Sequence, residues 1–191
     1  MGMKTQQKNT GFWHFTREFF RDPRGIGALF PSSPFLARRM AELVPAGEGA
    51  VVELGPGLGP VTRALLEGGI AKTDLILIER SANMVQHLRQ EFPGVEVIHG
   101  DAAELASLIS DRSPVRAIVS SLPLRTIPPN IVGRILAEVP KCARRGTAFI
   151  QFTYHPLHSC AGLSGKFTHQ RASYVWRNLP PARVDCFHFG D

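Results

Sequence analysis

The chain has 191 residues, 43% of them hydrophobic, and it carries a formal net charge of +6. This length and composition suit one buried core, and no apolar run is long enough to span a bilayer or to act as a secretory signal. The three cysteines, Cys142, Cys160 and Cys186, contain no Cys-x-x-Cys pair, so we expect reduced thiols in a cytoplasmic protein rather than a disulfide framework.

The first predicted element is an amphipathic helix close to the N-terminus. Rings on one face and guanidinium groups elsewhere suit a helix in a lipid headgroup layer, which predicts membrane contacts by Phe12, Trp13, Phe15, Arg17, Phe19, Phe20 and Arg21. The same pattern also suits a helix packed on the domain with its rings in the core, or one that alternates between the two. We therefore expect residues 1–30 to form a membrane-binding arm and residues 31–191 to form the main domain.

A second helix is predicted to begin at Pro34, with Ser33 as its N-cap. Its apolar residues up to Val44 lie on one face, which predicts packing against a sheet.

The most informative segment is Ala50–Gly59, an apolar strand followed by a turn with glycine at every second position. Alternating glycines allow a sharp turn and a close approach of the backbone to a ligand. The spacing Glu-x-Gly-x-Gly-x-Gly resembles motif I of class I S-adenosylmethionine methyltransferases, and a helix is predicted over 60–66. The resemblance implies cofactor contacts by Glu53, Gly55, Pro56, Gly57 and Gly59, with the carboxylate balancing the cationic end of S-adenosylmethionine.

Three further predicted strands, over residues 74–78, 95–99 and 115–119, also end in polar or kinked segments. Because the carboxyl ends of parallel strands meet at one edge of a sheet, these segments are expected to form one site with the glycine turn. An acid after the second strand suits the ribose hydroxyls, and the resemblance puts an acid near adenine and the fourth strand end beside the transferred methyl. The predicted cofactor residues here are Glu79, Arg80, Asp101, Ala102 and Ser120.

The remaining pattern completes an α/β plan. A helix is predicted over 130–142, a fifth strand over 147–154, and a hairpin that pairs 173–177 with 184–189. Strand–helix alternation that ends in a hairpin predicts a seven-stranded, mostly parallel sheet with one antiparallel strand, the Rossmann-like fold of class I S-adenosylmethionine-dependent methyltransferases.

Charge is distributed unevenly along the chain. Residues 1–40 carry a net +5, residues 41–124 a net −5 and residues 125–191 a net +6. The basic ends, and not the acidic cofactor half, are thus expected to meet a polyanion, either a nucleic acid or an anionic membrane.

Several segments together resemble the small bacterial phospholipid N-methyltransferases, over nearly the whole chain. They are Arg21–Pro23, Pro31–Pro34, Val52–Gly57, Ser120–Leu124, Gln151–Tyr154 and Val175–Ala182. The resemblance implies stepwise methylation of phosphatidylethanolamine towards phosphatidylcholine, with S-adenosylhomocysteine as the second product. It also implies a peripheral protein on the inner face of the cytoplasmic membrane, and we expect a monomer.

The chemistry of the acceptor suggests roles for the later segments. Ser121 and Tyr154 are the predicted catalytic residues, and Tyr154 would orient the amine through its hydroxyl or a cation–π contact. His155 is a possible proton acceptor or a residue of a surface turn. Arg177 would hold the lipid phosphate or form a structural salt bridge. The predicted substrate-binding residues are Leu122, Pro123, Leu124, Tyr154 and Arg177.

An rRNA adenine-N6 methyltransferase is the main alternative, because it shares motif I and suits a basic chain. Such enzymes resemble Asn-x-Pro-aromatic at the fourth strand end, where the amide bonds the adenine amino group and the ring stacks on the base. Ser121-Leu122-Pro123-Leu124 supplies neither group, so we expect a lipid and no nucleic acid. A non-catalytic module that binds S-adenosylmethionine or a membrane is a third possibility. The spacing of His155, His158 and Cys160 matches no standard zinc pattern, so no metal is expected.

Overall fold

The computed structural model of the chain describes residues 32–112, 114–155, 163 and 167–190. The chain divides into two compact units, Met1–Pro31 and Ser32–Asp191, and all of the described residues belong to the second. The predicted membrane arm, with Phe12, Trp13, Phe15, Arg17, Phe19, Phe20 and Arg21, lies outside the described residues. Within the described part, no helix has the length and apolar character needed to cross a membrane.

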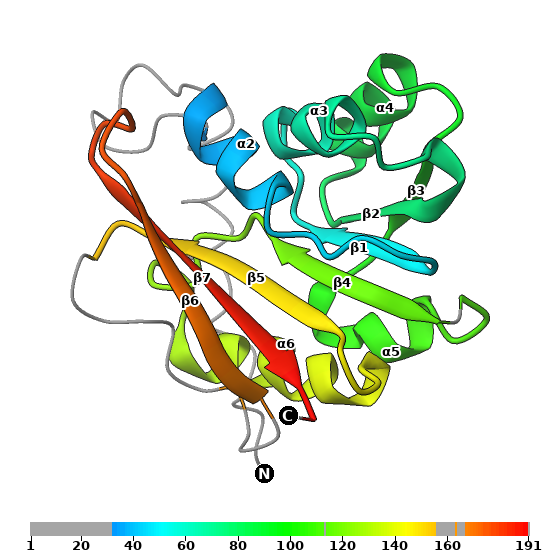
Figure 1. The fold of residues 1–191 in the computed structure, drawn as a ribbon. Helices are drawn as coiled ribbons and strands as arrows, with labels where there is room; N and C mark the ends of the chain where they lie inside the picture. Colours follow the sequence, from blue (N-terminus) through cyan, green and yellow to red (C-terminus); the bar gives the residue numbers. More distant parts are fainter. Residues whose placement is uncertain (1–31, 113, 156–162, 164–166, 191) are drawn as a thin grey trace, which may run out of the picture. The chain divides into compact units, whose positions relative to one another are not determined.

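The described residues form a sheet of seven strands in the order β3-β2-β1-β4-β5-β7-β6 (Figure 1). β7 runs antiparallel to both of its neighbours, and the other pairs are parallel, as the sequence predicts. The strands are β1 (Ala50–Leu54), β2 (Leu75–Glu79), β3 (Glu96–His99), β4 (Val115–Ser120), β5 (Ala148–Thr153), β6 (Phe167–Val175) and β7 (Ala182–Phe189).

Helices cover both faces of the sheet, α2, α3 and α4 on one and α5 and α6 on the other (Figure 1). Their bounds are α2 (Pro34–Ala41), α3 (Pro60–Glu67), α4 (Ala82–Glu91), α5 (Leu105–Leu108) and α6 (Pro129–Cys142), with short 3-10 turns at Lys72–Asp74 and Ala102–Glu104. The central strands are largely apolar because both of their faces are buried, and Leu54, Leu77 and Ile118 have no exposed surface.

The start of α2 is as predicted, since the Ser33 hydroxyl accepts a hydrogen bond from the backbone N–H of Leu36 at 3.3 Å. Its end is not. The helix stops at Ala41, and the backbone N–H of Val44 donates to Ala41 in a tighter turn. The ring of Pro45 disfavours the helical conformation of the residue before it, Val44, which explains why the helix ends early.

The hairpin of β6 and β7 is confirmed, with Ser173 opposite Val184 and Val175 opposite Ala182. However, β6 begins at Phe167, six residues before the predicted start, and ends before Trp176. Its first half is largely exposed and polar because β6 is the edge strand of the sheet. A search for apolar runs therefore finds only its carboxyl half.

Candidate active site

The glycine turn after β1 is held in a conformation that favours glycine. Gly55, Gly57 and Gly59 have φ angles of 65°, 58° and 79°, in the left-handed region that other residues rarely adopt. A Cβ on Gly55 would overlap the side chain of Leu122, and one on Gly59 would overlap the ring of Phe92. The turn thus packs directly against the segment after β4 and against the end of α4.

Replacing Gly55 by alanine is expected to lower the free energy of unfolding by about 2–5 kcal/mol, from left-handed strain and overpacking together. Gly69→Ala is the matched control, because Gly69 also has a positive φ (92°) but its Cβ would meet nothing within 4 Å. The control should lose only about 1–2 kcal/mol. Urea unfolding of both variants measures the difference, and equal losses would show that Leu122 does not confine the turn.

Glu53 is fully buried and connects α3, which follows the glycine turn, to the segment after β4. Its carboxylate accepts hydrogen bonds from the hydroxyl of Thr62 on α3 at 2.6 Å and from that of Ser121 at 2.7 Å. Burial, with a smaller contribution from nearby Glu79, raises the pKa of Glu53 to about 7, although both hydroxyls favour the charged form. The side chain therefore sits close to the boundary between its charged and neutral states near neutral pH.

Glu79 closes the next strand and shares its carboxylate between two backbone groups. It accepts from the N–H of Ser81 at 2.8 Å and from that of Gly57 at 3.3 Å. Burial raises its pKa, and these backbone N–H donors oppose the rise. This contact places Glu79 directly beside the glycine turn, where a ribose would lie.

Asp101 has a structural role, and its contact with the cofactor stays a prediction. One carboxylate oxygen accepts from the backbone N–H of Ala103 at 3.0 Å, and the other pairs with the guanidinium of Arg80 at 3.1 Å. Ala102 follows and is buried. The structure thus brings together the residues predicted at the ends of β2 and β3.

The residues present fit the predicted cofactor. Gly55, Gly57 and Gly59 leave the backbone without side chains, so a ligand can approach it closely. Two buried carboxylates, Glu53 and Glu79, supply acceptors for an ammonium and for ribose hydroxyls.

A row of buried polar side chains crosses three strands next to the segment that follows β4. Ser120 on β4 pairs in register with Gln151 on β5, and Gln151 pairs with Asp185 on β7. Register partners point to the same face of a sheet. The Ser120 hydroxyl, the amide oxygen of Gln151 and one carboxylate oxygen of Asp185 are buried without a hydrogen-bond partner among the described residues. Burying such groups without hydrogen-bond partners is unfavourable, so the row favours binding of a ligand that donates hydrogen bonds.

Asp185 is positioned by two cationic or potentially cationic side chains. One carboxylate oxygen accepts from the Arg183 guanidinium at 2.9 and 2.7 Å and lies 2.8 Å from Nε2 of His169, while the other is the unpartnered oxygen. The sequence-based prediction missed both Gln151 and Asp185 as site residues. Part of the signal was available, because Gln151 interrupts an apolar run in β5 and Asp185 lies between Val184 and Cys186 in β7.

Tyr154 lies just after β5, and its side chain is hydrogen-bonded to Asn178. Burial raises its pKa, and this hydrogen bond opposes the rise. Asn178 is itself buried, accepts from the backbone N–H of Ser33 at 3.1 Å and donates to the Pro180 carbonyl at 2.7 Å. Asn178 was not predicted, yet it joins three segments on which the family resemblance rests.

Arg177 follows the end of β6. Its guanidinium lies over the ring of Phe35 at the start of α2, 5.0 Å from the ring centre. This contact within the described residues is with a ring and not with a carboxylate, so the phosphate role and the salt bridge both stay predictions.

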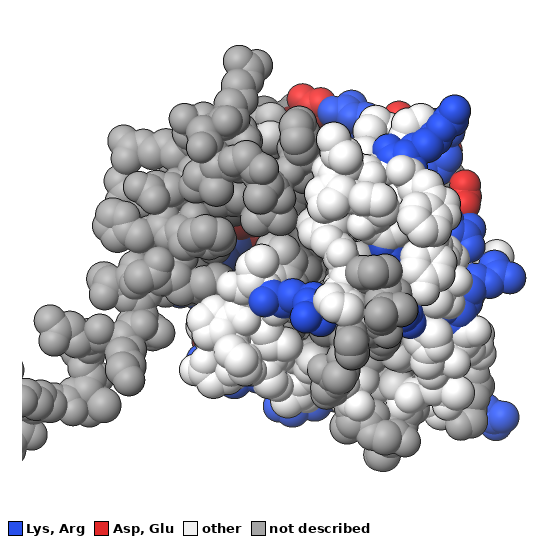
Figure 2. All heavy atoms as spheres, turned by 90° about the vertical axis from the view of Figure 1, so that its left-hand side faces the viewer, with Lys and Arg blue, Asp and Glu red and all other residues white. Residues whose placement is uncertain are grey.

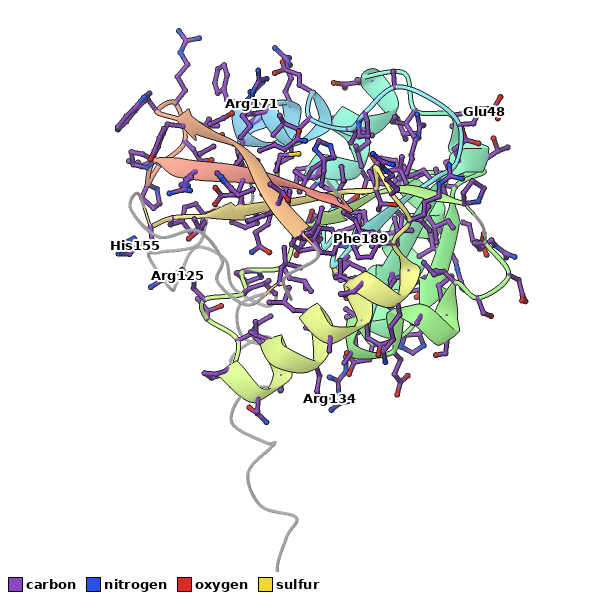
Figure 3. The ribbon with its side chains drawn as sticks, turned by 60° about the horizontal axis from the view of Figure 1, so that its bottom comes forward. Glu48, Arg125, Arg134, His155, Arg171 and Phe189 are labelled. Carbon is purple, nitrogen blue, oxygen red and sulfur yellow. The ribbon has the colours of Figure 1, made fainter. Side chains whose placement is uncertain are left out.

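His155 lies after β5, where its backbone N–H donates to the Thr153 hydroxyl at 3.1 Å (Figure 3). His158 and Cys160, the other members of the cluster considered for zinc, lie outside the described residues. Among the residues that are described, no group of three or more histidine, cysteine or acidic side chains is arranged to hold a metal ion.

Comparisons with known proteins agree with this geometry. Residues 51–146, half of the chain, match the family described as a methyltransferase domain. An ornithine lipid N-methyltransferase of Singulisphaera acidiphila is 29% identical over 177 residues, which are 90% of this chain and 92% of that protein. A ribosomal RNA small subunit methyltransferase A of Rhodopseudomonas palustris is 34% identical over 121 residues, but these are 60% of this chain and only 41% of that protein.

Two solved structures share the fold. A Burkholderia thailandensis 1,6-didemethyltoxoflavin-N1-methyltransferase with bound S-adenosylhomocysteine has a TM-score of 0.69 at 15% identity, over 100% of this chain and 93% of that one. The N-methyltransferase NodS of Bradyrhizobium japonicum, also with S-adenosylhomocysteine, has a TM-score of 0.67 at 12% identity, over 94% of this chain and 98% of that one. The predicted fold class is confirmed, and the chain belongs to the methyltransferase domain family, as an enzyme that uses S-adenosylmethionine.

Proposed function

We propose that this enzyme methylates the primary amine of a membrane lipid. The observation that carries the proposal is the similarity over 90% of the chain to an ornithine lipid N-methyltransferase. The predicted acceptor is phosphatidylethanolamine, methylated stepwise towards phosphatidylcholine. Ornithine lipid is the second candidate, because that relative's name specifies it. Both lipids present a primary ammonium close to an anionic group.

The polar row across β4, β5 and β7 suits such an acceptor. A primary amine donates hydrogen bonds, and Ser120, Gln151 and Asp185 each offer an unpartnered buried oxygen. Asp185 also favours a cation, although Arg183 offsets part of its charge. Because lipid amines resemble lysine, with a pKa of about 10, a proton must leave before the nitrogen attacks. The proton would pass to water. The row would hold a primary or monomethylated nitrogen through its N–H groups before and after that loss, and a dimethylated one only before it.

The other residues position and shield the reaction. Bound S-adenosylmethionine supplies an activated methyl group, so the enzyme mainly has to align the nitrogen and exclude water. Glu53 fixes the Ser121 hydroxyl, and Gly55 packs against Leu122, so the glycine turn and the segment after β4 act as one rigid wall. Tyr154, held by Asn178, would orient the amine from the end of β5.

The segment Ser121–Leu124 argues against an adenine acceptor, because it contains neither the amide nor the ring that adenine recognition requires. The rRNA methyltransferase relative also matches over a smaller part of the chain. An rRNA adenine acceptor is therefore kept as an outcome of the test. We place the protein on the inner face of the cytoplasmic membrane as a peripheral monomer, in keeping with a lipid acceptor.

The test incubates the purified full chain with methyl-labelled S-adenosylmethionine in separate reactions. The acceptors are phosphatidylethanolamine in detergent micelles, ornithine lipid in the same detergent, and ribosomal RNA, with Glu79→Ala as the inactive control. We expect label in mono- and dimethylated phosphatidylethanolamine. Label in ornithine lipid alone would make ornithine lipid, and not phosphatidylethanolamine, the acceptor. Label only in RNA would contradict a lipid acceptor.

A further inference from the structure

Large apolar side chains gather at the turn between β6 and β7. Among the described residues, five large hydrophobic side chains are exposed, and four of them lie at this turn or at the adjoining start of α2. Their exposed fractions are 75% for Trp176, 75% for Leu179, 47% for Tyr174 and 43% for Phe35. Such clustering on one tip differs from the scattered exposure that is normal on a protein surface.

Arginines surround the tip. A groove of about 320 Å³ between α2 and the end of β6 is lined by Arg38, Arg39 and Arg177. Arg39 is bound to Glu42 at 2.9 Å and to Ser173 at 2.7 Å, so part of its charge is already paired. Figure 2, which faces the side where this turn lies, shows more basic than acidic side chains on the described part of the surface.

The tip is rigid. Asn178 is buried below it and bonds both to the start of α2, through Ser33, and to Pro180. The rings of Tyr174 and Trp176 stack at 5.9 Å with an angle of 20° between their planes. A preordered tip loses little conformational entropy on binding, which favours a site that is ready to dock.

We propose that this tip, Phe35, Tyr174, Trp176 and Leu179 with Arg38 and Arg177, inserts into the headgroup layer of an anionic phospholipid bilayer. Exposed rings and an aliphatic side chain suit the boundary between headgroups and acyl chains, and the arginines suit lipid phosphates. Leu179 argues against RNA, since base stacking uses rings and an exposed leucine offers none. The inference rests on the proposed lipid substrate and adds a docking site apart from the predicted arm.

The chain's two tryptophans allow a direct test, because Trp13 belongs to the predicted arm and Trp176 to the tip. The full chain carrying Trp13→Phe reports only Trp176, and the one carrying Trp176→Phe reports only Trp13. Vesicles of phosphatidylglycerol and phosphatidylcholine should shift the Trp176 emission to the blue, and brominated lipids should quench it. Unchanged Trp176 emission, with or without a shift of Trp13, would overturn the docking site, as would a shift caused by RNA and not by vesicles.

Two variants quantify the contacts by vesicle sedimentation. Trp176→Ala with Leu179→Ala should weaken binding by about tenfold or more, because two exposed apolar side chains lose their buried area. Arg38→Gln with Arg177→Gln should weaken it by about fivefold for each arginine at low salt. The matched control is Arg134→Gln with Arg145→Gln, which removes the same charge from α6 and the turn after it (Figure 3). An equal loss of vesicle binding in the control would show that net charge alone explains the effect, which would contradict the docking site.

Activity in detergent micelles separates this inference from the proposed function, because micelles supply lipid without a bilayer. The variant carrying Trp176→Ala and Leu179→Ala should keep at least half of the wild-type methyl transfer there. If wild type methylates neither lipid in micelles but Trp176 still enters vesicles, the proposed function fails and the docking site stands.

Discussion

Replacing Glu53 by glutamine is expected to weaken S-adenosylmethionine binding by about 10–100-fold, the range for losing a charge-assisted hydrogen bond. The same change should stabilise the cofactor-free protein at alkaline pH. Glu53 is fully buried, and its pKa is raised from 4.5 to about 7. The folded protein therefore keeps this proton to a higher pH than the unfolded chain does. Wild type should lose stability relative to the variant as the pH rises from about 4.5 to about 7.

The size of the effect follows from the pKa difference, which corresponds to about 3 kcal/mol once the carboxylate is charged. Urea unfolding of both proteins at pH 5 and pH 8.5, with calorimetry for the cofactor, measures both effects. Glu67→Gln, at an exposed acid that ends α3, is the control and should change neither. A stability difference that does not grow with pH would contradict a buried, partly neutral Glu53. Unchanged affinity would remove it from the cofactor site.

Replacing Asp185 by asparagine is expected to lower kcat/KM for the lipid by about 10–100-fold, again the range for a hydrogen bond to a charged group. Cofactor affinity should stay the same, because Asp185 lies on β7 and not at the glycine turn. The variant should also lose stability, since Arg183 keeps a largely buried charge beside the altered group. Steady-state kinetics in micelles, with calorimetry for S-adenosylmethionine, measures these effects.

A companion variant separates ligand binding from structure. Gln151→Leu removes an amide oxygen that is buried without a partner among the described residues, together with an amide N–H that donates to the Phe152 carbonyl at 3.1 Å. The two effects oppose each other, so stability should change by less than about 1 kcal/mol. The variant should nevertheless raise KM for the lipid. Gln151→Leu with unchanged kinetics would show that the polar row does not meet the acceptor.

Much of the fold was predictable because the local signals agree with the global plan. A few neighbouring residues determine the conformation of each apolar strand, of the glycine turn and of the Ser33 cap. The first half of β6 escaped prediction because an edge strand exposes polar side chains and loses its apolar pattern. The end of α2 depends on Pro45, because this helix breaker overrides the apolar pair Leu43 and Val44 that precedes it.

The site was predictable only where its residues lie at or beside the carboxyl ends of strands. Glu53 and Glu79 belong to this class, and the structure adds that both are buried and that Ser121 bonds to the first. Asn178 could not be assigned from sequence, because its partner Ser33 lies 145 residues away. The polar row likewise exists only once β4, β5 and β7 are in register.

The central claim, that the acceptor is a lipid amine, is tested most directly by competition. The purified chain is given S-adenosylmethionine with micelles that contain phosphatidylethanolamine and ornithine lipid in equal amounts, together with ribosomal RNA, and the products are identified by mass spectrometry. We predict methyl groups on the headgroup nitrogen of a lipid, with phosphatidylethanolamine preferred, and none on RNA. Methylated adenine in the RNA, with both lipids unchanged, would contradict a lipid acceptor.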